Sequence, residues 1–246
     1  MIKPVIYTQI PQSDPALLAE AAEAGVADLH EALGAVTGRM LLMDPRMRPL
    51  DMKMRVAGPA VTAFNYPGDN LMMHQALYLA TKGQVLVMAN GGGHQGALWG
   101  ELAGHYAQHK GIAGLVADAA VRDSAQLVEI GFPTWSTAIH ASHPEKRGPG
   151  AVNVPVVVGG VIVNPGDIVV GDADGVLVIP PEHLAHAVKG ARERKAKEDG
   201  VRAKLAAGAT LYDILGIAKA IEATGAEVRE TTWLQDQAKK WEGRPA

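Results

Sequence analysis

A glycine-rich segment between two apolar runs constrains the fold of this chain more than any other feature. Residues 89–104 read ANGGGHQGALWGELAG and follow the apolar run 84–88. A second strand-like run, 112–118, comes directly after the helix-like stretch that ends near Lys110. A strand that leads through a glycine-rich turn into a helix presents free backbone N–H groups to an anion. We therefore expect a mixed α/β fold in which the turn at 91–93 binds an anion.

Arg122 and Asp123 follow the second strand-like run closely. Taken alone, they favour a structural salt bridge or a cap for the predicted helix 125–130. The helix that begins near Gly100 changes this interpretation, because open α/β sheets bind ligands at the carboxyl ends of neighbouring strands. Together, an anion-binding turn, an arginine and a carboxylate indicate an enzyme more than a scaffold.

Composition excludes several classes of protein. The 246 residues carry a formal net charge of −3, which argues against a dedicated nucleic-acid surface. The chain has no cysteine, so disulfides and thiolate metal sites are excluded and any metal would be held by oxygen or imidazole. No apolar run approaches the ~20 residues of a membrane helix, and the first residues lack the apolar core of a signal peptide. We therefore expect a cytoplasmic enzyme with no nucleic-acid and no membrane partner.

The pattern of apolar runs and turns predicts one domain over 1–246, with a core at about 26–180 and a helical tail at about 181–246. The expected helices are 13–25, 26–33, 70–81, about 100–110 and 125–130, and the expected β runs are 56–66, 84–88, 112–118, 154–163, 167–170 and 175–179. No further strand–helix–strand unit is expected after Gly131.

Two other sites compete with this interpretation. Gly91, Gly93 and Gly96 match the G-x-G-x-x-G dinucleotide fingerprint, and Asp118 stands near the position of a ribose-binding acid. Against an NAD-dependent dehydrogenase, the helix starts only near Gly100, whereas in that motif it starts within the glycines. A plain connecting loop is the other alternative.

Histidines suggest a metal site less strongly. Glu101, His105 and His109 would share one helical face, as zinc ligands can, but a solvated or interface face is the more common role of such histidines. The remaining pairs are typical of surface positions: His140 and His143, and His183 and His186. No serine-hydrolase elbow and no His-Glu-x-x-His motif occurs.

Several motifs, in order and spacing, resemble the RraA-like family over roughly 26–215. They are Trp99-Gly100-Glu101-Leu102, Gly114-x-Val116-x-Asp118-x-x-Val121-Arg122-Asp123, Phe132-Pro133-x-Trp135, and Pro165-Gly166-Asp167 with Asp172-x-Asp174-Gly175-Val176. Within the family the chain is most similar to 4-hydroxy-4-methyl-2-oxoglutarate/4-carboxy-4-hydroxy-2-oxoadipate aldolases. Pro67-Gly68-Asp69-Asn70-x-Met72-Met73-His74 strengthens that similarity.

The resemblance implies a fold, an assembly and a reaction. The fold would be an α-β-β-α sandwich of the swivelling β/β/α type, with helical N- and C-terminal extensions. The assembly would be a homotrimer or a dimer of trimers with the active site between subunits. The reaction would be metal-dependent (class II) cleavage of a 4-hydroxy-2-oxo dicarboxylic or tricarboxylic acid to pyruvate and a 2-oxo acid, with oxaloacetate decarboxylation as a side activity.

The resemblance also implies roles for particular residues. Asp123 would bind Mg²⁺ or Mn²⁺ directly, while Glu101, and Glu198 of the neighbouring subunit, would act through water. Arg122 would hold the pyruvyl part of the substrate, and its carboxylate would meet the backbone of Gly100, Glu101, Leu102 and Ala103. Family members often carry Asp in place of Glu101, and the tail beyond about Gly216 has no counterpart.

The chemistry of the residues agrees with a metal-dependent lyase. Cleavage must stabilise a pyruvate enolate, which suits a Lewis acid and an arginine, and a base must take the C4 hydroxyl proton. No lysine lies inside an apolar strand, which disfavours a Schiff-base mechanism. The RraA name also covers shorter proteins that inhibit an RNA-degrading endonuclease, so a regulator is the alternative. Contacts to the distal part of the substrate are open, with Asn70, His74 and Lys146 as candidates.

Overall fold

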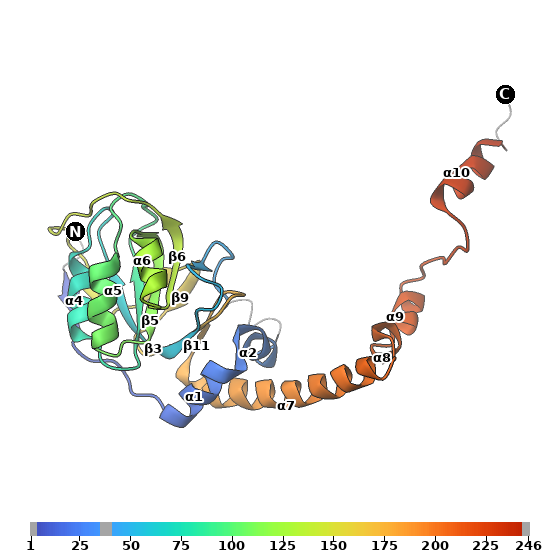
Figure 1. The fold of residues 1–246 in the computed structure, drawn as a ribbon, viewed down its shortest axis with the longest axis horizontal. Helices are drawn as coiled ribbons and strands as arrows, with labels where there is room; N and C mark the ends of the chain where they lie inside the picture. Colours follow the sequence, from blue (N-terminus) through green and yellow to red (C-terminus); the bar gives the residue numbers. More distant parts are fainter. Residues whose placement is uncertain (1–3, 35–40, 243–246) are drawn as a thin grey trace. The chain divides into compact units, whose positions relative to one another are not determined.

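The computed structural model describes residues 4–34 and 41–242 (Figure 1). The chain divides into two compact units, Met1–Lys195 and Ala196–Ala246. The boundary lies inside helix α7 (Pro181–Ala206) rather than at its start. Across the described residues, no helix is both long enough and apolar enough to span a membrane.

A parallel sheet with helical crossovers forms the middle of the first unit. In chain order it contains β3 (Val56–Phe64), α4 (Leu71–Leu79), β4 (Val85–Ala89), α5 (Glu101–His109), β5 (Gly114–Val121), α6 (Ser124–Glu129) and β6 (Thr134–Ile139). Each strand pairs in parallel with the next, so the carboxyl ends of β4 and β5 lie at the same edge. Short strands complete the sheet: β1 (Val5–Ile6) pairs with β7 (Ala151–Val152), β7 with β3, and β2 (Arg48–Pro49) with β6.

Strand β6 corrects the expectation that no strand–helix–strand unit follows Gly131. It pairs in parallel with β5 after the helix α6, which makes one more such unit. The run Thr134–Ile139 has no continuous apolar stretch. Its polar residues therefore gave no signal for a buried strand. Thr134 Oγ1 donates to Phe132 O at 3.1 Å and Ser136 Oγ to Ala138 O at 3.2 Å, so both hydroxyls are satisfied locally while buried.

Strand β3 connects this sheet to a second β layer. Its first half, 56–59, pairs antiparallel with β10 (Ile168–Gly171), and its second half, 60–64, pairs with β4. β10 also pairs with β11 (Val176–Ile179), and β8 (Val156–Val158) forms a hairpin with β9 (Val161–Val163). The expected single run 154–163 is therefore two strands, which turn at Gly159 and Gly160, both with positive φ.

Three apolar clusters hold four layers together, which confirms the predicted α-β-β-α sandwich. The first cluster lies between the parallel sheet and α4, α5 and α6, which stand together on one face in Figure 1. The second lies between the β layers and includes the fully buried Trp135. The third packs α1 (Pro15–Ala24), α2 (Val26–Ala32) and the start of α7 onto β10 and β11. Burial of each large side chain contributes ~1.5–3 kcal/mol.

Two aspartates of the motifs that resemble the RraA-like family, Asp167 and Asp172, stabilise this packing. Asp172 Oδ2 accepts from Val26 N at 2.9 Å at the start of α2, and Asp172 O accepts from Trp135 Nε1 at 3.0 Å. Asp167 Oδ2 accepts from Asn164 N at 2.7 Å in the turn before β10. Burial raises the pKa of Asp167 even though Asn164 lowers it. These residues thus fix the second β layer and do not line the site described below.

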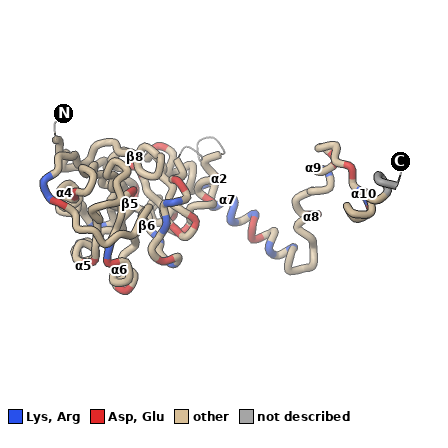
Figure 2. The backbone as a smooth tube through the Cα atoms, turned by 90° about the horizontal axis from the view of Figure 1, so that it is seen from above, with Lys and Arg blue, Asp and Glu red and all other residues tan. Residues whose placement is uncertain are grey.

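The tail is helical, as predicted. After α7 come α8 (Leu211–Ile214), α9 (Ile217–Ala223) and α10 (Trp233–Glu242). Figure 2 shows basic and acidic residues interspersed along α7. Between residues 196 and 238 no residue is buried. Short helices without a buried face are marginal in water, so these helices gain little from packing within their own chain.

Candidate active site

A pocket of about 300 Å³ lies at the carboxyl end of β5 and the start of α5. It brings together the predicted site residues of the first unit: Gly100, Glu101, Leu102, Ala103, Arg122 and Asp123. A second wall comes from α4 and from the loop after β6, with Asn70, His74, His143 and Lys146. The predicted Glu198 belongs to the second unit, where its Oε2 accepts from Arg202 Nη2 at 2.7 Å.

Asp123 adopts a left-handed backbone conformation, with φ 55° and ψ 39°. For a residue other than glycine this costs about 1–2 kcal/mol. Asp123 stands at the N-cap of α6, as predicted, but its side chain makes no capping hydrogen bond. Instead, its Oδ2 accepts from the backbone N of Glu101 at 3.2 Å, across the pocket floor. The backbone strain therefore turns a carboxylate away from its own helix and toward α5.

The Arg122 side chain is only lightly engaged. Its Nε lies 3.5 Å from Asp123 Oδ2, and its side chain is 37% exposed. Among the described residues neither Nη atom has a hydrogen-bond partner, and Asp123 Oδ1 has none either. The two Nη groups form the planar fork that binds carboxylates in a bidentate manner. The site thus offers a free guanidinium edge beside a free carboxylate oxygen.

Gly100 is required by a close approach rather than by a turn. Its backbone is extended, with φ −154°. A Cβ at this position would lie 2.5 Å from Asp123 Oδ2 and 3.2 Å from Arg122 Cγ. Directly after Gly100, the N–H groups of Leu102 and Ala103 lie in the first turn of α5, where they have no partner within the helix. Backbone donors, Arg122 and Asp123 therefore share one small space.

Glu101 lies in the pocket and contacts a histidine one turn along α5. Its Oε2 is 3.5 Å from His105 Nε2, and the histidine side chain is 57% exposed. His109, a further turn along, is also exposed, as predicted for a solvated face. In the part of the chain that the structure describes, no three His, Asp or Glu side chains gather in a geometry that could hold a metal. A zinc site on this face therefore has no support.

The sequence predicts only part of the second wall of the pocket. It indicates a surface position for His143, which is indeed exposed, but His143 also lines the pocket. Partial burial lowers the pKa of His74, and the positive charge of Lys146 lowers it further, although Asp69 acts in the opposite direction. Loop 140–148 reaches the pocket only through contacts with residues far away in sequence, so no local pattern could have indicated it.

The glycine turn does not line this pocket, which corrects the expectation that the anion site of the enzyme lies at 91–93. Gly91 and Gly92 border a different, largely apolar hollow of about 520 Å³. The dinucleotide alternative loses support as well, because both oxygens of Asp118 are already bonded. They accept from Thr137 Oγ1 at 3.2 Å and from Gly159 N at 3.0 Å. As predicted, the helix starts well beyond the glycines, at Glu101.

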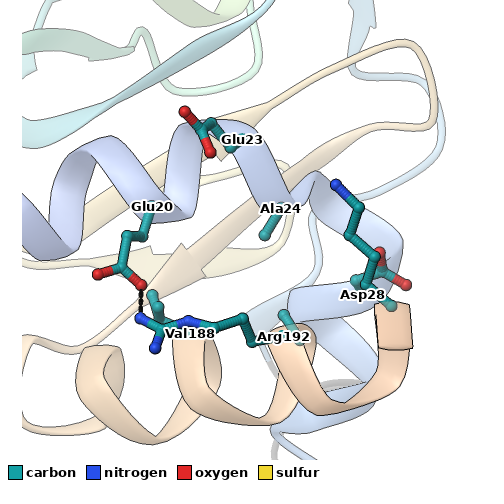
Figure 3. A pocket seen from close by; sticks show the side chains of 8 residues that line it. Glu20, Glu23, Ala24, Asp28, Val188 and Arg192 are labelled. Atoms are coloured by element: carbon teal, nitrogen blue, oxygen red, sulfur yellow. Dashed lines mark hydrogen bonds and ion pairs between the residues drawn. The ribbon is translucent and has the colours of Figure 1, made fainter. Parts of the chain in front are cut away.

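Another pocket, of about 250 Å³, lies between α1, α2 and α7 (Figure 3). An ion pair between Glu20 and Arg192 crosses it, and Glu23 and Asp28 stand on its rim. No predicted site residue lines it. Its charged groups connect α1 and α7 and show no arrangement of catalytic groups.

Comparison with known proteins points to one family. The model of the RraA-like family, described as Aldolase/RraA, matches residues 26–178. A protein of Halalkalibacterium halodurans named "Putative 4-hydroxy-4-methyl-2-oxoglutarate aldolase" is 37% identical over 171 residues, which are 70% of this chain and 80% of that protein. A Burkholderia mallei protein of the same name is 39% identical over 153 residues, which are 62% of this chain and 92% of that protein.

Solved structures agree with the family. Streptomyces coelicolor RraAS2, described as an unusual member of the RNase ES inhibitor RraA protein family, superposes with a TM-score of 0.72 at 28% identity, over 79% of this chain and 99% of that one. An uncharacterized protein from Pseudomonas syringae gives 0.73 at 27% identity, over 82% and 98%. The family model covers more than half of this chain. By sequence and by fold, the chain belongs to the RraA-like family.

Proposed function

We propose that the protein is a divalent-metal-dependent aldolase that cleaves a 4-hydroxy-2-oxo dicarboxylic or tricarboxylic acid to pyruvate and a 2-oxo acid. The observation that carries this proposal is the pairing of a free Arg122 fork with the strained, outward-turned carboxylate of Asp123. Strained backbone at a pocket is typical of functional sites. The aldolase names of the two relatives support the same class of reaction.

The residues suit the charge that such a cleavage creates. When the C3–C4 bond breaks, its electron pair passes to the pyruvyl part and forms an enolate. The Arg122 Nη groups and the N–H groups of Leu102 and Ala103 stabilise that negative charge and bind the pyruvyl carboxylate. The start of α5 fixes the two backbone N–H donors, and Arg122 follows directly after the end of β5.

The donor set fits Mg²⁺ or Mn²⁺. The free oxygen of Asp123 is a hard, anionic ligand, and Glu101 adds a second carboxylate in the same pocket. One direct carboxylate, with water and substrate in the remaining positions, is a common arrangement for these ions. When bound, such an ion would supply Lewis-acid stabilisation of the 2-keto oxygen and the enolate. We place it on Asp123, with Glu101 acting through water.

Glu101 is the proposed source of base catalysis. Its carboxylate polarises a water that takes the C4 hydroxyl proton, and the C4–O bond becomes the carbonyl of the departing 2-oxo acid. The proton then returns to C3 of the enolate, which gives pyruvate. Where this chain has Glu101, relatives with Asp would place the carboxylate one methylene further back, and the contact with His105 at 3.5 Å helps to hold the longer side chain.

Regulation of an RNA-degrading endonuclease is the alternative function. Streptomyces coelicolor RraAS2 is described as an unusual member of the RNase ES inhibitor RraA protein family. The Thermus thermophilis protein is described as the RNA-processing inhibitor RraA, and it superposes with a TM-score of 0.53 at 33% identity over 56% of this chain and 84% of that one. A regulator that only binds a protein surface needs no free guanidinium and carboxylate in a pocket. We therefore favour the enzyme.

We expect the purified protein to release pyruvate from 4-hydroxy-4-methyl-2-oxoglutarate when Mg²⁺ is present. Oxaloacetate should also release pyruvate, because its decarboxylation passes through the same enolate. A coupled assay that detects pyruvate measures both reactions. Absence of pyruvate from a panel of 4-hydroxy-2-oxo acids and from oxaloacetate, with Mg²⁺ or Mn²⁺ present, would contradict the proposed function.

We further propose that the active protein is a homotrimer or a homohexamer, in which Glu198 of one subunit reaches the site of a neighbour and acts there through water. The resemblance to the family suggests this role, and the second unit supports it because none of its residues between 196 and 238 is fully buried. Glu198→Ala should then lower kcat for pyruvate release by roughly tenfold or more, as expected for one electrostatic contact at a reacting centre.

Mixed oligomers test whether this site is shared. When Glu198→Ala subunits exchange with Arg122→Ala subunits, some interfaces combine an intact Arg122 with an intact Glu198. Such mixtures should be clearly more active than either variant alone. Inactive mixtures, with subunit exchange proven by native mass spectrometry, would place Glu198 outside the site.

A further inference from the structure

The second wall of the pocket carries polar groups that the proposed reaction has not yet used. Asn70, His74, His143 and Lys146 line it opposite Arg122. Once the pyruvyl part of a 4-hydroxy-2-oxo dicarboxylic acid is bound at Arg122, the remaining part offers one hydroxyl donor and one or two carboxylates. The chemistry of this wall therefore indicates which substrates the site can distinguish.

Asn70 presents a buried acceptor with no partner. The residue is 6% exposed, and its Nδ2 donates to the backbone O of Leu98 at 3.3 Å. Because that carbonyl can only accept, the contact fixes the orientation of the amide. Oδ1 is then left without a hydrogen-bond partner among the described residues. A buried acceptor is costly unless a ligand or water donates to it, and a substrate hydroxyl is such a donor.

Lys146 is a free cation on a fixed backbone. On one side, Glu145 O accepts from Asn70 N at 3.0 Å, and on the other, Arg147 N donates to Asp69 Oδ2 at 2.5 Å. Burial of Asp69 would raise its pKa, but the backbone N–H donors outweigh this and hold its pKa below the ordinary value. The Lys146 side chain is exposed and has no ion-pair partner within the described residues.

Lys146 is the main positive charge on this wall. Burial and the charge of Lys146 lower the pKa of His74, which favours the neutral form of its ring. Asp69 attracts Lys146 at a distance but forms no ion pair with it, because both carboxylate oxygens already accept from backbone N–H groups. A carboxylate at the far end of a substrate therefore finds a cation that no side chain of the described residues pairs with.

We propose that Asn70 and Lys146 form a specificity subsite, in which Asn70 Oδ1 binds the C4 hydroxyl and Lys146 binds the distal carboxylate. This inference rests on the proposed function and deepens it. The subsite selects acids with a carboxylate beyond C4 over those with a neutral end. It also makes Lys146 a binding residue rather than a Schiff-base nucleophile.

The decisive experiment compares Lys146→Met with Arg147→Met. Arg147 is the adjacent cation; its side chain is 91% exposed, and it does not line the pocket. With 4-hydroxy-4-methyl-2-oxoglutarate, Lys146→Met should lower kcat/KM about 10–100-fold, mainly through KM, as expected for loss of a charged hydrogen bond. With 4-hydroxy-2-oxopentanoate, which keeps the C4 hydroxyl and methyl groups but lacks the distal carboxylate, the change should stay below about threefold. Lys146→Arg should keep most of the activity, and Arg147→Met should match the unaltered protein.

Asn70→Ala gives an independent readout. It should lower cleavage of both hydroxy acids about tenfold and leave oxaloacetate decarboxylation almost unchanged, because oxaloacetate has no C4 hydroxyl. Equal losses for all three substrates would assign Asn70 a structural role and overturn its part of the proposal.

Three results would overturn the subsite as a whole. The first is an equal loss of activity by Lys146→Met with both hydroxy acids, and the second is no loss with the dicarboxylate. The third is a covalent label on Lys146 after reduction with borohydride in the presence of pyruvate, which would make Lys146 a nucleophile. If instead the unaltered protein releases no pyruvate from any of these acids, the proposed function fails and the subsite fails with it. If the unaltered protein is fully active and Lys146→Met keeps its kcat/KM for the dicarboxylate, only the subsite is contradicted and the proposed function stands.

Discussion

Removal of divalent metal with EDTA is expected to abolish pyruvate release, and Mg²⁺ or Mn²⁺ is expected to restore it. Asp123 is the one direct protein ligand that we propose, and water and substrate fill the other positions. An ion held in this way binds with modest affinity and exchanges readily. Pyruvate release measured before chelation, after chelation and after addition of metal tests the expectation.

A variant of the ligand separates metal binding from other effects of EDTA. Asp123→Asn keeps the shape of the side chain and tolerates a left-handed backbone, but it removes the negative charge. The variant should need a much higher Mn²⁺ concentration for half-maximal activity, and calorimetry should show weaker Mn²⁺ binding. Unchanged activity of the chelated protein, with the absence of metal confirmed by elemental analysis, would contradict the metal-dependent mechanism.

The elements that place the catalytic wall follow from local patterns in the sequence. The apolar runs that form β4 and β5 are buried, as continuous apolar strands between two layers must be. Arg122 and Asp123 come directly after β5, so their position at its carboxyl end needs no tertiary information. The start of α5 at Glu101 was likewise predictable, because the glycines and polar residues before it delay the helix.

The conformation of Asp123 could not be predicted in the same way. A carboxylate before a helix favours a capping side chain, and the local pattern therefore indicated a cap. In the structure, the contact with Glu101 N and the space left by Gly100 turn the side chain away from the helix. That outcome depends on tertiary structure, since α5 and β5 separate Glu101 from Asp123 along the chain.

The second wall depends still more on distant contacts. Asp69 binds the backbone of Arg147 and Gly148, which are 78 and 79 residues further along the chain. No periodicity or turn signal connects two such segments, so Lys146 was only one of several candidates for a distal contact. For the glycine turn, the local pattern was misleading. Its composition suggested an anion site, but tertiary packing places Gly91 and Gly92 beside another hollow.

Arg122→Ala is expected to lower kcat/KM for aldol cleavage by at least about 10²–10³, which corresponds to several kcal/mol of transition-state stabilisation. The guanidinium stabilises charge that develops on the enolate, so its loss affects the chemical step more than substrate binding. Oxaloacetate decarboxylation should fall by a similar factor, because it forms the same enolate. The fold and the oligomeric state should survive, because the side chain is 37% exposed and its ion pair with Asp123 spans 3.5 Å.

Arg122→Lys distinguishes the geometry of the guanidinium from its charge. Lysine keeps the positive charge but cannot offer two parallel N–H groups to a carboxylate. If the free Nη fork binds the substrate in a bidentate manner, the lysine variant should recover little of the lost rate. Steady-state kinetics with both substrates, together with circular dichroism and size-exclusion chromatography, provide the measurement. Near-normal activity of Arg122→Lys would show that Arg122 acts only through its positive charge. Bidentate binding of the substrate by the two Nη groups would then be contradicted.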